Sequence, residues 1–225
     1  MTFQTPSGFT QIDTDSGTAT ITNTKPNTSI VGDNGITTSA SGSAITVDGT
    51  DIGIEFVQST NVNPASPPST IEFINLPNSA VFLFLYEKVT PSTSGAHLTL
   101  EFSNDNGSTW LTSGYSAGLN HTAFNATTFS NINSTSNFPL SDALSSSSSS
   151  LAGEIKILQM QGPDPVRVMG QTQFRNSSGV ERNGYLAGVS PFPSPTPNSF
   201  RVLMNTGTMG TGRFSLYAFT RIKAF

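Results

Sequence analysis

The sequence predicts an all-β protein, namely an antiparallel β-sandwich of the jelly-roll type preceded by a segment of short strands. Ser, Thr, Asn and Gly account for 100 of the 225 residues, whereas Lys, Arg, Asp and Glu account for only 24. Helix surfaces are normally covered by charged residues and Ala, so this composition disfavours helices. Apolar and polar residues alternate in many stretches of residues 70–225, which is the period of a strand. No helical spacing separates these stretches, which leaves an antiparallel sandwich of jelly-roll or immunoglobulin-like kind.

Residues 1–60 are predicted to form an attachment or trimerisation segment of very short strands. Strand-like triplets such as 20–22 and 45–47 alternate with turn residues such as 32–35. Strands this short carry one or two Ile or Val each and cannot enclose a core alone. We therefore expect an intertwined homotrimer in which these side chains are buried against the other copies. The candidate interface residues are Ile30, Val31, Ile36, Ile45, Val47, Ile52 and Ile54.

Residues 61–69 are predicted to be a linker. They contain Pro64, Pro67 and Pro68. Proline fixes φ and lacks an amide donor, so such a stretch favours an extended, semi-rigid spacer.

Residues 70–225 are predicted to form the sandwich, with about eight strands. Leu98, Leu100 and Phe102 share one face of a strand, with Thr99 and Glu101 on the other. Residues 81–86 are continuously apolar and indicate a strand buried on both sides. The expected strands cover residues 71–74, 80–90, 98–102, 154–160, 166–175, 200–204 and 213–224.

Two segments of the predicted sandwich lack strand patterns. Residues 116–153 contain six consecutive serines, and long ordered connections of this kind tend to be binding or interface elements. Residues 191–197 carry prolines at alternate positions, which favours an extended spacer. The sequence leaves the roles of both segments open.

Composition excludes several kinds of site. The chain has no cysteine, which removes disulfides, thiol nucleophiles and Cys-based metal centres, and its two histidines lack metal-ligand spacing. No metal or cofactor is therefore expected. Residues 1–150 carry 2 basic and 11 acidic side chains, and residues 151–225 carry 8 and 3. This asymmetry fits either chance or charge complementarity between subunits.

The arginines are spread along predicted strands without interleaved aromatic residues, so nucleic acid is not an expected partner. Residues 1–10 show no signal peptide, and no apolar stretch reaches membrane-spanning length. We expect synthesis in the cytoplasm and no insertion into a membrane.

Residues 114–118 match the G-x-S-x-G pattern of serine hydrolases. With this composition, about a quarter of a match per chain arises by chance. The pattern also needs a following helix and an acid between the serine and the histidine, and neither is present between Ser116 and His121. No catalytic residue is assigned, and the chain is expected not to be an enzyme.

Residues 103–110 match the S-x-D-x-G-x-T-W pattern called the Asp box, which arises by chance in about one in ten thousand chains of this composition. Asp105 is expected to accept backbone hydrogen bonds and Gly107 to adopt positive φ in a β-hairpin turn. Trp110 is expected to cover the turn and pack on the sheet. Ser103 and Thr109 complete this structural motif.

Residues 70–225 resemble C-terminal domains of tailed-bacteriophage virion proteins. The resemblance is carried by Ile71-Glu72-Phe73, the Asp box and Gly212-Arg213-Phe214-Ser215-Leu216-Tyr217-Ala218, where that family usually ends in G-x-F-x-L-Y-G. Residues 31–47 are similar to segments of tail-fibre and head-fibre proteins, which are commonly trimeric. No functional residues carry over from either resemblance.

The resemblance implies a non-enzymatic virion structural protein, foremost a tail-fibre or receptor-binding component. The alternative is a capsid decoration, cement or head-fibre protein. A tailspike-type glycan hydrolase ranks below both, because it needs paired carboxylates in a groove. The implied partners are other copies of the chain, other virion proteins and a host-surface glycan or receptor, with the virion as location.

Overall fold

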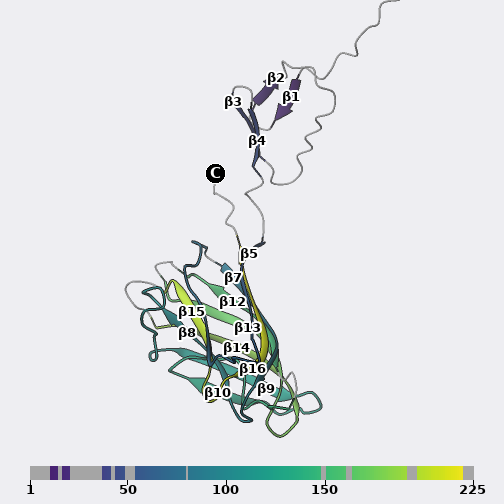
Figure 1. Cartoon of the computed structure of the whole chain (residues 1–225), viewed down its shortest axis with the longest axis vertical. Coiled ribbons are helices and arrows are strands. Elements are labelled where there is room, and N and C mark those ends of the chain that lie inside the picture. Colours follow the sequence, from purple (N-terminus) through teal and green to yellow (C-terminus); the bar gives the residue numbers. More distant parts are fainter. Residues whose placement is uncertain are drawn as a thin grey trace, which may run out of the picture. The chain divides into compact units, whose positions relative to one another are not determined.

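The computed structural model describes residues 11–14, 17–20, 37–41, 44–48, 54–79, 81–147, 151–160, 164–191 and 197–219 (Figure 1). These residues contain sixteen strands and no helix. The chain divides into two units, one made of residues 1–53 with 220–225 and the other of Ile54–Phe219. The expected all-β class is therefore confirmed for the described residues.

The described part of the first unit holds two small antiparallel sheets. One pairs β1 (Gln11–Thr14) with β2 (Gly17–Thr20), and the other pairs β3 (Thr37–Ser41) with β4 (Ala44–Asp48). Of the candidate trimer-interface residues, Ile45 and Val47 lie on β4. Ile30, Val31, Ile36 and Ile52 lie outside the described residues. The homotrimer stays a prediction.

The second unit is an antiparallel sandwich of two sheets, as expected. The smaller sheet has the order β11 (Phe138–Pro139), β8 (Leu98–Ser103), β15 (Ser199–Met204) and β6 (Thr70–Phe73). The larger sheet has the order β10 (Ser130–Ser134), β9 (Ser116–Ala123), β14 (Glu181–Val189), β13 (Arg167–Arg175), β12 (Leu151–Leu158), β7 (Val81–Pro91), β16 (Met209–Phe219) and β5 (Ile54–Asn61).

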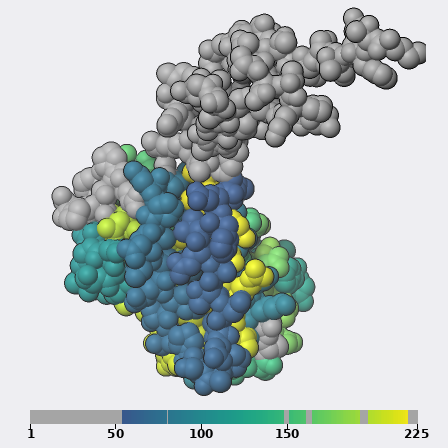
Figure 2. Space-filling model, turned by 45° about the horizontal axis from the view of Figure 1, so that its top comes forward, coloured from purple at the N-terminus to yellow at the C-terminus, as the bar shows by residue number. Residues whose placement is uncertain are grey.

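Eight of these strands are connected as a jelly roll. One sheet contains the run β5-β16-β7-β12 and the other is β6-β15-β8-β11, so the chain folds back on itself with its first strand beside its last. This is the strand order of two interlocked Greek keys. Ile54 at the start of β5 pairs with Phe219 at the end of β16. Figure 2 shows the early strands, in blue, beside the last ones, in yellow.

Two inserted hairpins widen the larger sheet. The β9–β10 hairpin lies between β8 and β11 in the chain, and the β13–β14 hairpin lies between β12 and β15. They pair with each other through β9 and β14 and extend the sheet beyond β12. The expectation that residues 116–153 are irregular is thus wrong. Strands such as β10 are built from Ser and Asn and carry little apolar alternation, so the sequence pattern missed them.

The sandwich begins at residue 54 and not at residue 70. β5 pairs with β16, so residues 54–60, which the sequence pattern groups with the trimerisation segment, belong to the sandwich. Residues 61–69 connect β5 to β6 within the sandwich. Val62 is buried in this connection, and its backbone N–H donates to the carbonyl of Gly212 at 2.8 Å. The Pro-rich stretch is therefore a loop tied to the sandwich and not a spacer between units.

Aromatic side chains fill the space between the sheets. Phe73 and Phe200 of the smaller sheet stack with ring centroids 4.7 Å apart, and each contacts Phe84 of the larger sheet edge-on at 5.2 Å. All three side chains are fully buried. Edge-to-face and offset pairs are the favoured aromatic geometries, so this cluster joins the two sheets at their centre.

Two burial predictions need correction. In residues 81–86 only alternate side chains such as Phe82 and Phe84 are fully buried, while Leu83 and Leu85 are half-buried on the outer face. In β8 the face expected to be solvent-facing is buried, with Glu101 only 6% exposed.

Candidate functional site

A groove of about 520 Å³ lies on the outer face of the larger sheet of the described sandwich. Its volume is in the range of small-ligand sites. Residues of β16, β7, β12 and β13 line it. The lining residues are Leu85, Tyr86, Glu87, Ala152, Gly153, Glu154, Gln171, Thr172, Gln173, Arg213, Ser215 and Tyr217.

Strand register brings these residues together from distant parts of the chain. Ser215 pairs with Leu85, which pairs on its other side with Glu154, which in turn pairs with Gln171. Directly opposed residues in antiparallel strands project from the same face of a sheet. One row of side chains therefore runs across four strands and forms the middle of the groove.

Backbone irregularities lie beside the groove. The β12–β7 register shifts between Leu151 and Gly153, and the β16–β7 register shifts between Thr211 and Arg213. Bulges raise local twist and redirect side chains. At Gly153 an added Cβ would lie 2.5 Å from the Tyr86 hydroxyl oxygen. A residue without a side chain is therefore needed at position 153 to leave room for the Tyr86 hydroxyl.

The charged and amide groups of the groove form two exposed contacts. Arg213 Nη1 lies 3.6 Å from Glu87 Oε1, with both side chains about half exposed. Gln171 Nε2 donates a hydrogen bond to Glu154 Oε1 at 3.1 Å. The Glu87 carboxylate therefore lies beside a positive charge, and the Glu154 carboxylate accepts a hydrogen bond from an amide.

Glu87 and Glu154 form a pair of carboxylates facing one groove, which the sequence did not reveal. The two residues lie on the adjacent strands β7 and β12. A glycoside hydrolase needs one carboxylic acid kept protonated by apolar surroundings. Both side chains here are exposed and have polar partners. This arrangement suits hydrogen bonding to a ligand better than acid catalysis.

The serine-hydrolase pattern does not form a site in the described structure. Ser116 begins β9 and His121 lies five residues further along the same strand. At the rise of a β-strand, five residues span about 17 Å. Ser116 and His121 therefore cannot act as a nucleophile and base pair within one chain.

Both histidines instead lie near Asp142. His121 Nε2 is 3.6 Å from Asp142 Oδ2, and His97 Nδ1 is 3.9 Å from Asp142 Oδ1. His121 is 2% exposed, and Arg182 Nη1 lies 3.3 Å from its Nδ1. Burial, opposed by Asp142 and reinforced by Arg182, lowers the pKa of His121. Among the described residues no group of three His, Cys, Asp or Glu side chains is placed to hold a metal ion.

The Asp box forms a tight turn. Asp105 Oδ1 accepts the backbone N–H of Thr109 at 2.8 Å, and Asp105 Oδ2 accepts the Thr109 hydroxyl at 2.6 Å. Ser103 donates to Asp105 at 2.7 Å and accepts from the Gly107 N–H at 2.9 Å. Gly107 has φ +89° and lies against the Trp110 ring. The hydrogen bonds to Asp105 lower its pKa to about 2, that of the Thr109 hydroxyl contributing most.

One expectation for this motif differs from the structure. The turn joins β8 of the smaller sheet to β9 of the larger one, so it does not close a hairpin between neighbouring strands. Trp110 is half-buried. The guanidinium of Arg201 covers the Trp110 ring, and Arg201 in turn bonds to Glu101.

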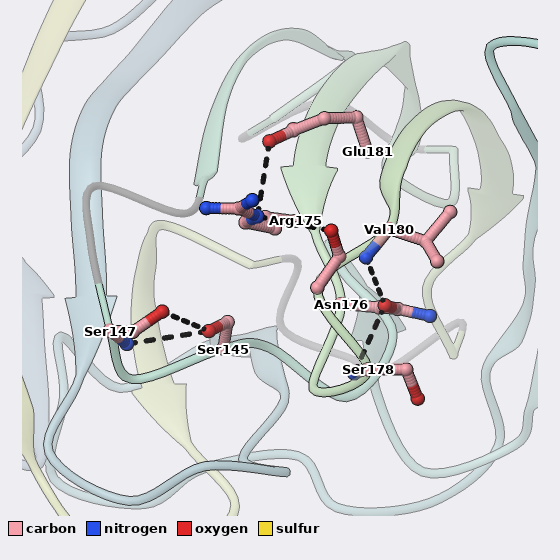
Figure 3. A network of polar contacts seen from close by, with 8 residues as sticks. Ser145, Ser147, Arg175, Asn176, Ser178, Val180 and Glu181 are labelled. Carbon is pink, nitrogen blue, oxygen red and sulfur yellow. Dashed lines mark hydrogen bonds and ion pairs between the residues drawn. The ribbon is translucent and has the colours of Figure 1, made fainter.

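The loop after β11 is held against the tip of the β13–β14 hairpin (Figure 3). Asn176 Oδ1 accepts the backbone N–H groups of Ser178 at 3.1 Å and Val180 at 2.9 Å, which makes an Asx turn. The Ser145 N–H donates to the carbonyl of Arg175 at 3.0 Å. The start of the serine run is therefore anchored by backbone hydrogen bonds.

Comparisons with known protein families, with curated proteins and with solved structures found no match. Within the described part of the chain, nothing helical is long and apolar enough to cross a membrane. The geometry of the groove is therefore the basis on which a function can be inferred.

Proposed function

We propose that this chain is a non-enzymatic structural protein of a tailed-phage virion, and specifically a tail-fibre or receptor-binding component. The outer face of the larger sheet is its binding face. The observation that carries the proposal is a jelly roll in which two inserted hairpins widen one sheet to eight strands, with a polar groove on that sheet. Jelly rolls recur in viral capsid proteins and lectins, which is a fold-level analogy.

The groove supports a binding role over an enzymatic one. Its carboxylates are exposed and engaged by Arg213 and Gln171. Ser116 and His121 are separated along β9. Stable binding surfaces on rigid strands suit attachment, because little ordering entropy is lost when the ligand binds.

The test is competition for adsorption. Host cells incubated with the purified full-length chain should adsorb fewer phage particles, in proportion to the protein added. A heat-unfolded sample of the same protein is the control. An image reconstruction of the particle should then place the chain on the tail. A capsid position without competition would support the decoration or head-fibre alternative and reject the proposed function.

A further inference from the structure

Residues 140–145, which we call the strap, connect the smaller sheet to the inserted hairpins. On the side of the smaller sheet, the Leu144 N–H donates to the carbonyl of Ala96, and the Leu144 carbonyl accepts the N–H of Gly95, both at 2.8 Å. The Leu144 side chain is fully buried. The strap is therefore fixed to the segment that precedes β8.

The other side of the strap meets the tip of the β13–β14 hairpin (Figure 3). The Ser145 N–H donates to the carbonyl of Arg175 at 3.0 Å, and the Ser177 N–H donates to the carbonyl of Ala143 at 2.8 Å. A separation of the hairpin from the strap breaks these two hydrogen bonds and leaves the long ladders of the central sheet paired. Such local openings need less free energy than global unfolding.

A buried histidine lies where the strap meets the hairpins. His121 of β9 is 2% exposed, and its Nε2 lies 3.6 Å from Oδ2 of Asp142 in the strap. The Phe174 ring of β13 packs edge-on against the imidazole, with centroids 5.5 Å apart. The Nδ1 atom of His121 faces Arg182 Nη1 of β14 at 3.3 Å. Water therefore reaches the ring only when one of these neighbours moves away.

Arg182 determines which nitrogen of His121 carries the proton. A guanidinium has donors and no acceptor, so Nδ1 accepts from Arg182 and the ring proton lies on Nε2, towards Asp142. A proton on Nδ1 would place two donors and two positive charges opposite each other. Arg182 Nε is buried and has no hydrogen-bond partner among the described residues, so it offers nothing to offset that loss.

The charged groups around His121 act in opposite directions. Burial lowers the pKa of His121, Asp142 opposes this change, and Arg182 adds to it. His97 lies on the other side of Asp142, with Nδ1 3.9 Å from Oδ1, so a positive charge there competes for the same carboxylate. Burial is the largest of these effects, and it is lost when the strap and the hairpins separate.

We infer that the strap and the inserted hairpins form a latch that opens in mild acid. In the closed form His121 is neutral and accepts a hydrogen bond from Arg182. In the open form the ring is hydrated and binds a proton from solvent on Nδ1, and the hydrogen bonds to the carbonyls of Arg175 and Ala143 are broken. The jelly-roll ladders remain paired in both forms. The latch goes beyond the proposed function and does not depend on it.

The test is amide hydrogen exchange of the full-length chain at pH 7.5 and 5.5, with rates corrected for the intrinsic effect of pH. The amides of Ser145 and Ser177 report on the latch, and those of the β7–β16 ladder report on global unfolding. We expect the two latch amides to exchange faster than the ladder and with a weaker dependence on denaturant.

The opening equilibrium constant of the latch should rise up to about tenfold between pH 7.5 and 5.5. This limit follows because the open form binds its proton with the ordinary pKa of 6.5, whereas the closed form binds it less readily. A fall in pH therefore favours the open form.

Two variants and one matched control assign the effect to His121. His121→Gln keeps an acceptor for Arg182 but does not titrate, so the rise should disappear. Arg182→Gln removes the opposing positive charge, so the rise should become smaller. Arg175→Gln is the control, because Arg175 lies on the neighbouring strand and its exposed side chain pairs with Glu181. A cooperative thermal transition at pH 7.5 shows that each variant is folded.

Three results would overturn the latch. Exchange of the latch amides with the same protection and denaturant dependence as the β7–β16 ladder would mean that His121 acts on global stability alone. A tenfold rise that persists in His121→Gln would assign the pH dependence to other groups. If His121→Gln does not fold, Arg182→Gln decides, and a rise equal to that of Arg175→Gln contradicts the inference.

Discussion

The guanidinium carbon of Arg201 lies 4.6 Å from the centre of the Trp110 ring. The same guanidinium donates two hydrogen bonds, at 3.0 and 2.7 Å, to one carboxylate oxygen of Glu101. The Asp-box turn is thereby fastened to the central strands of the smaller sheet, and the ion pair is shielded from solvent on one side. This contact explains why Glu101 is buried although its position in the sequence pattern predicts a solvent-facing side chain.

Replacing Trp110 by Ala should lower the free energy of unfolding by about 1–2 kcal/mol, because a partly shielded cation–π contact and part of the ring's burial are lost. Complete burial of the ring would imply a larger loss of unfolding free energy. Denaturant unfolding followed by circular dichroism measures the change, since the variant lacks the only tryptophan. Trp110→Phe should lose less. A loss above about 4 kcal/mol would mean that Trp110 is a core residue.

Asp105 should make stability depend on pH in strong acid. Its folded pKa of about 2 lies below the ordinary value of 3.8. The unfolded chain therefore takes up this proton first, and the contribution of Asp105 is present above pH 4 and is lost as the pH falls towards 2. Unfolding midpoints measured between pH 5 and 2 should fall less steeply in Asp105→Asn than in the unmodified chain. Equal slopes of the unfolding midpoint against pH in the two proteins would contradict the low folded pKa of Asp105.

His121 should make the sandwich lose stability in mild acid. Its folded pKa lies below the ordinary value of 6.5, so the unfolded chain binds this proton more readily. The contribution of the neutral, buried ring is present above pH 6.5 and declines as the pH falls below that value. His121→Gln should reduce the change in unfolding free energy between pH 7.5 and 5.5. His97→Gln, at a half-exposed position, is the control and should leave most of that change in place.

Gly153→Ala should destabilise the sandwich by about 1–3 kcal/mol through overpacking. The new Cβ would lie 2.5 Å from the Tyr86 hydroxyl oxygen and 2.6 Å from the carbonyl oxygen of Gln171. Gly210→Ala, whose Cβ would come no closer than 3.3 Å to its nearest neighbour, the carbonyl oxygen of Thr90, is the milder control.

Tyr86→Phe tests the same contact from the other side. The Tyr86 hydroxyl is buried and makes no well-aligned hydrogen bond, although the Thr172 side chain lies near enough to interact with it. Removing it should leave stability unchanged or slightly higher. In the Gly153→Ala background it should recover part of the loss, and a double-mutant cycle measures that coupling. Strictly additive effects would show that the clash is with the backbone of Gln171 alone.

The sandwich was predictable because apolar and polar residues alternate along several strands, and this alternation indicates which side chains are buried. β6 and β15 have large apolar residues at every second position, and both were located within about a residue. β9 and β10 escaped prediction, because Ser, Asn and Gly occupy many of their positions and pairing with neighbours determines their structure. The strand order confirmed the jelly-roll expectation over the immunoglobulin-like one.

The groove could not be predicted from the sequence. Glu87, Glu154 and Ser215 are separated by more than sixty residues at each step, and only the register of β7, β12 and β16 makes them neighbours. None lies in a motif. The Asp box, by contrast, was visible because the hydrogen bonds among its pattern residues Ser103, Asp105, Gly107 and Thr109 join residues within a few positions of one another.

The inserted hairpins β9–β10 and β13–β14 meet the eight jelly-roll strands along a single ladder, between β12 and β13. Substitutions in their tips, where Phe124 and Phe129 are about 60% exposed, change little of the central core. The hairpin strands themselves bury Leu119, Val168, Phe174 and Leu186 in the core, so only the tips contribute little to it. Sequence change is therefore tolerated best at these tips, where loops present side chains to solvent without altering the packing between the two sheets.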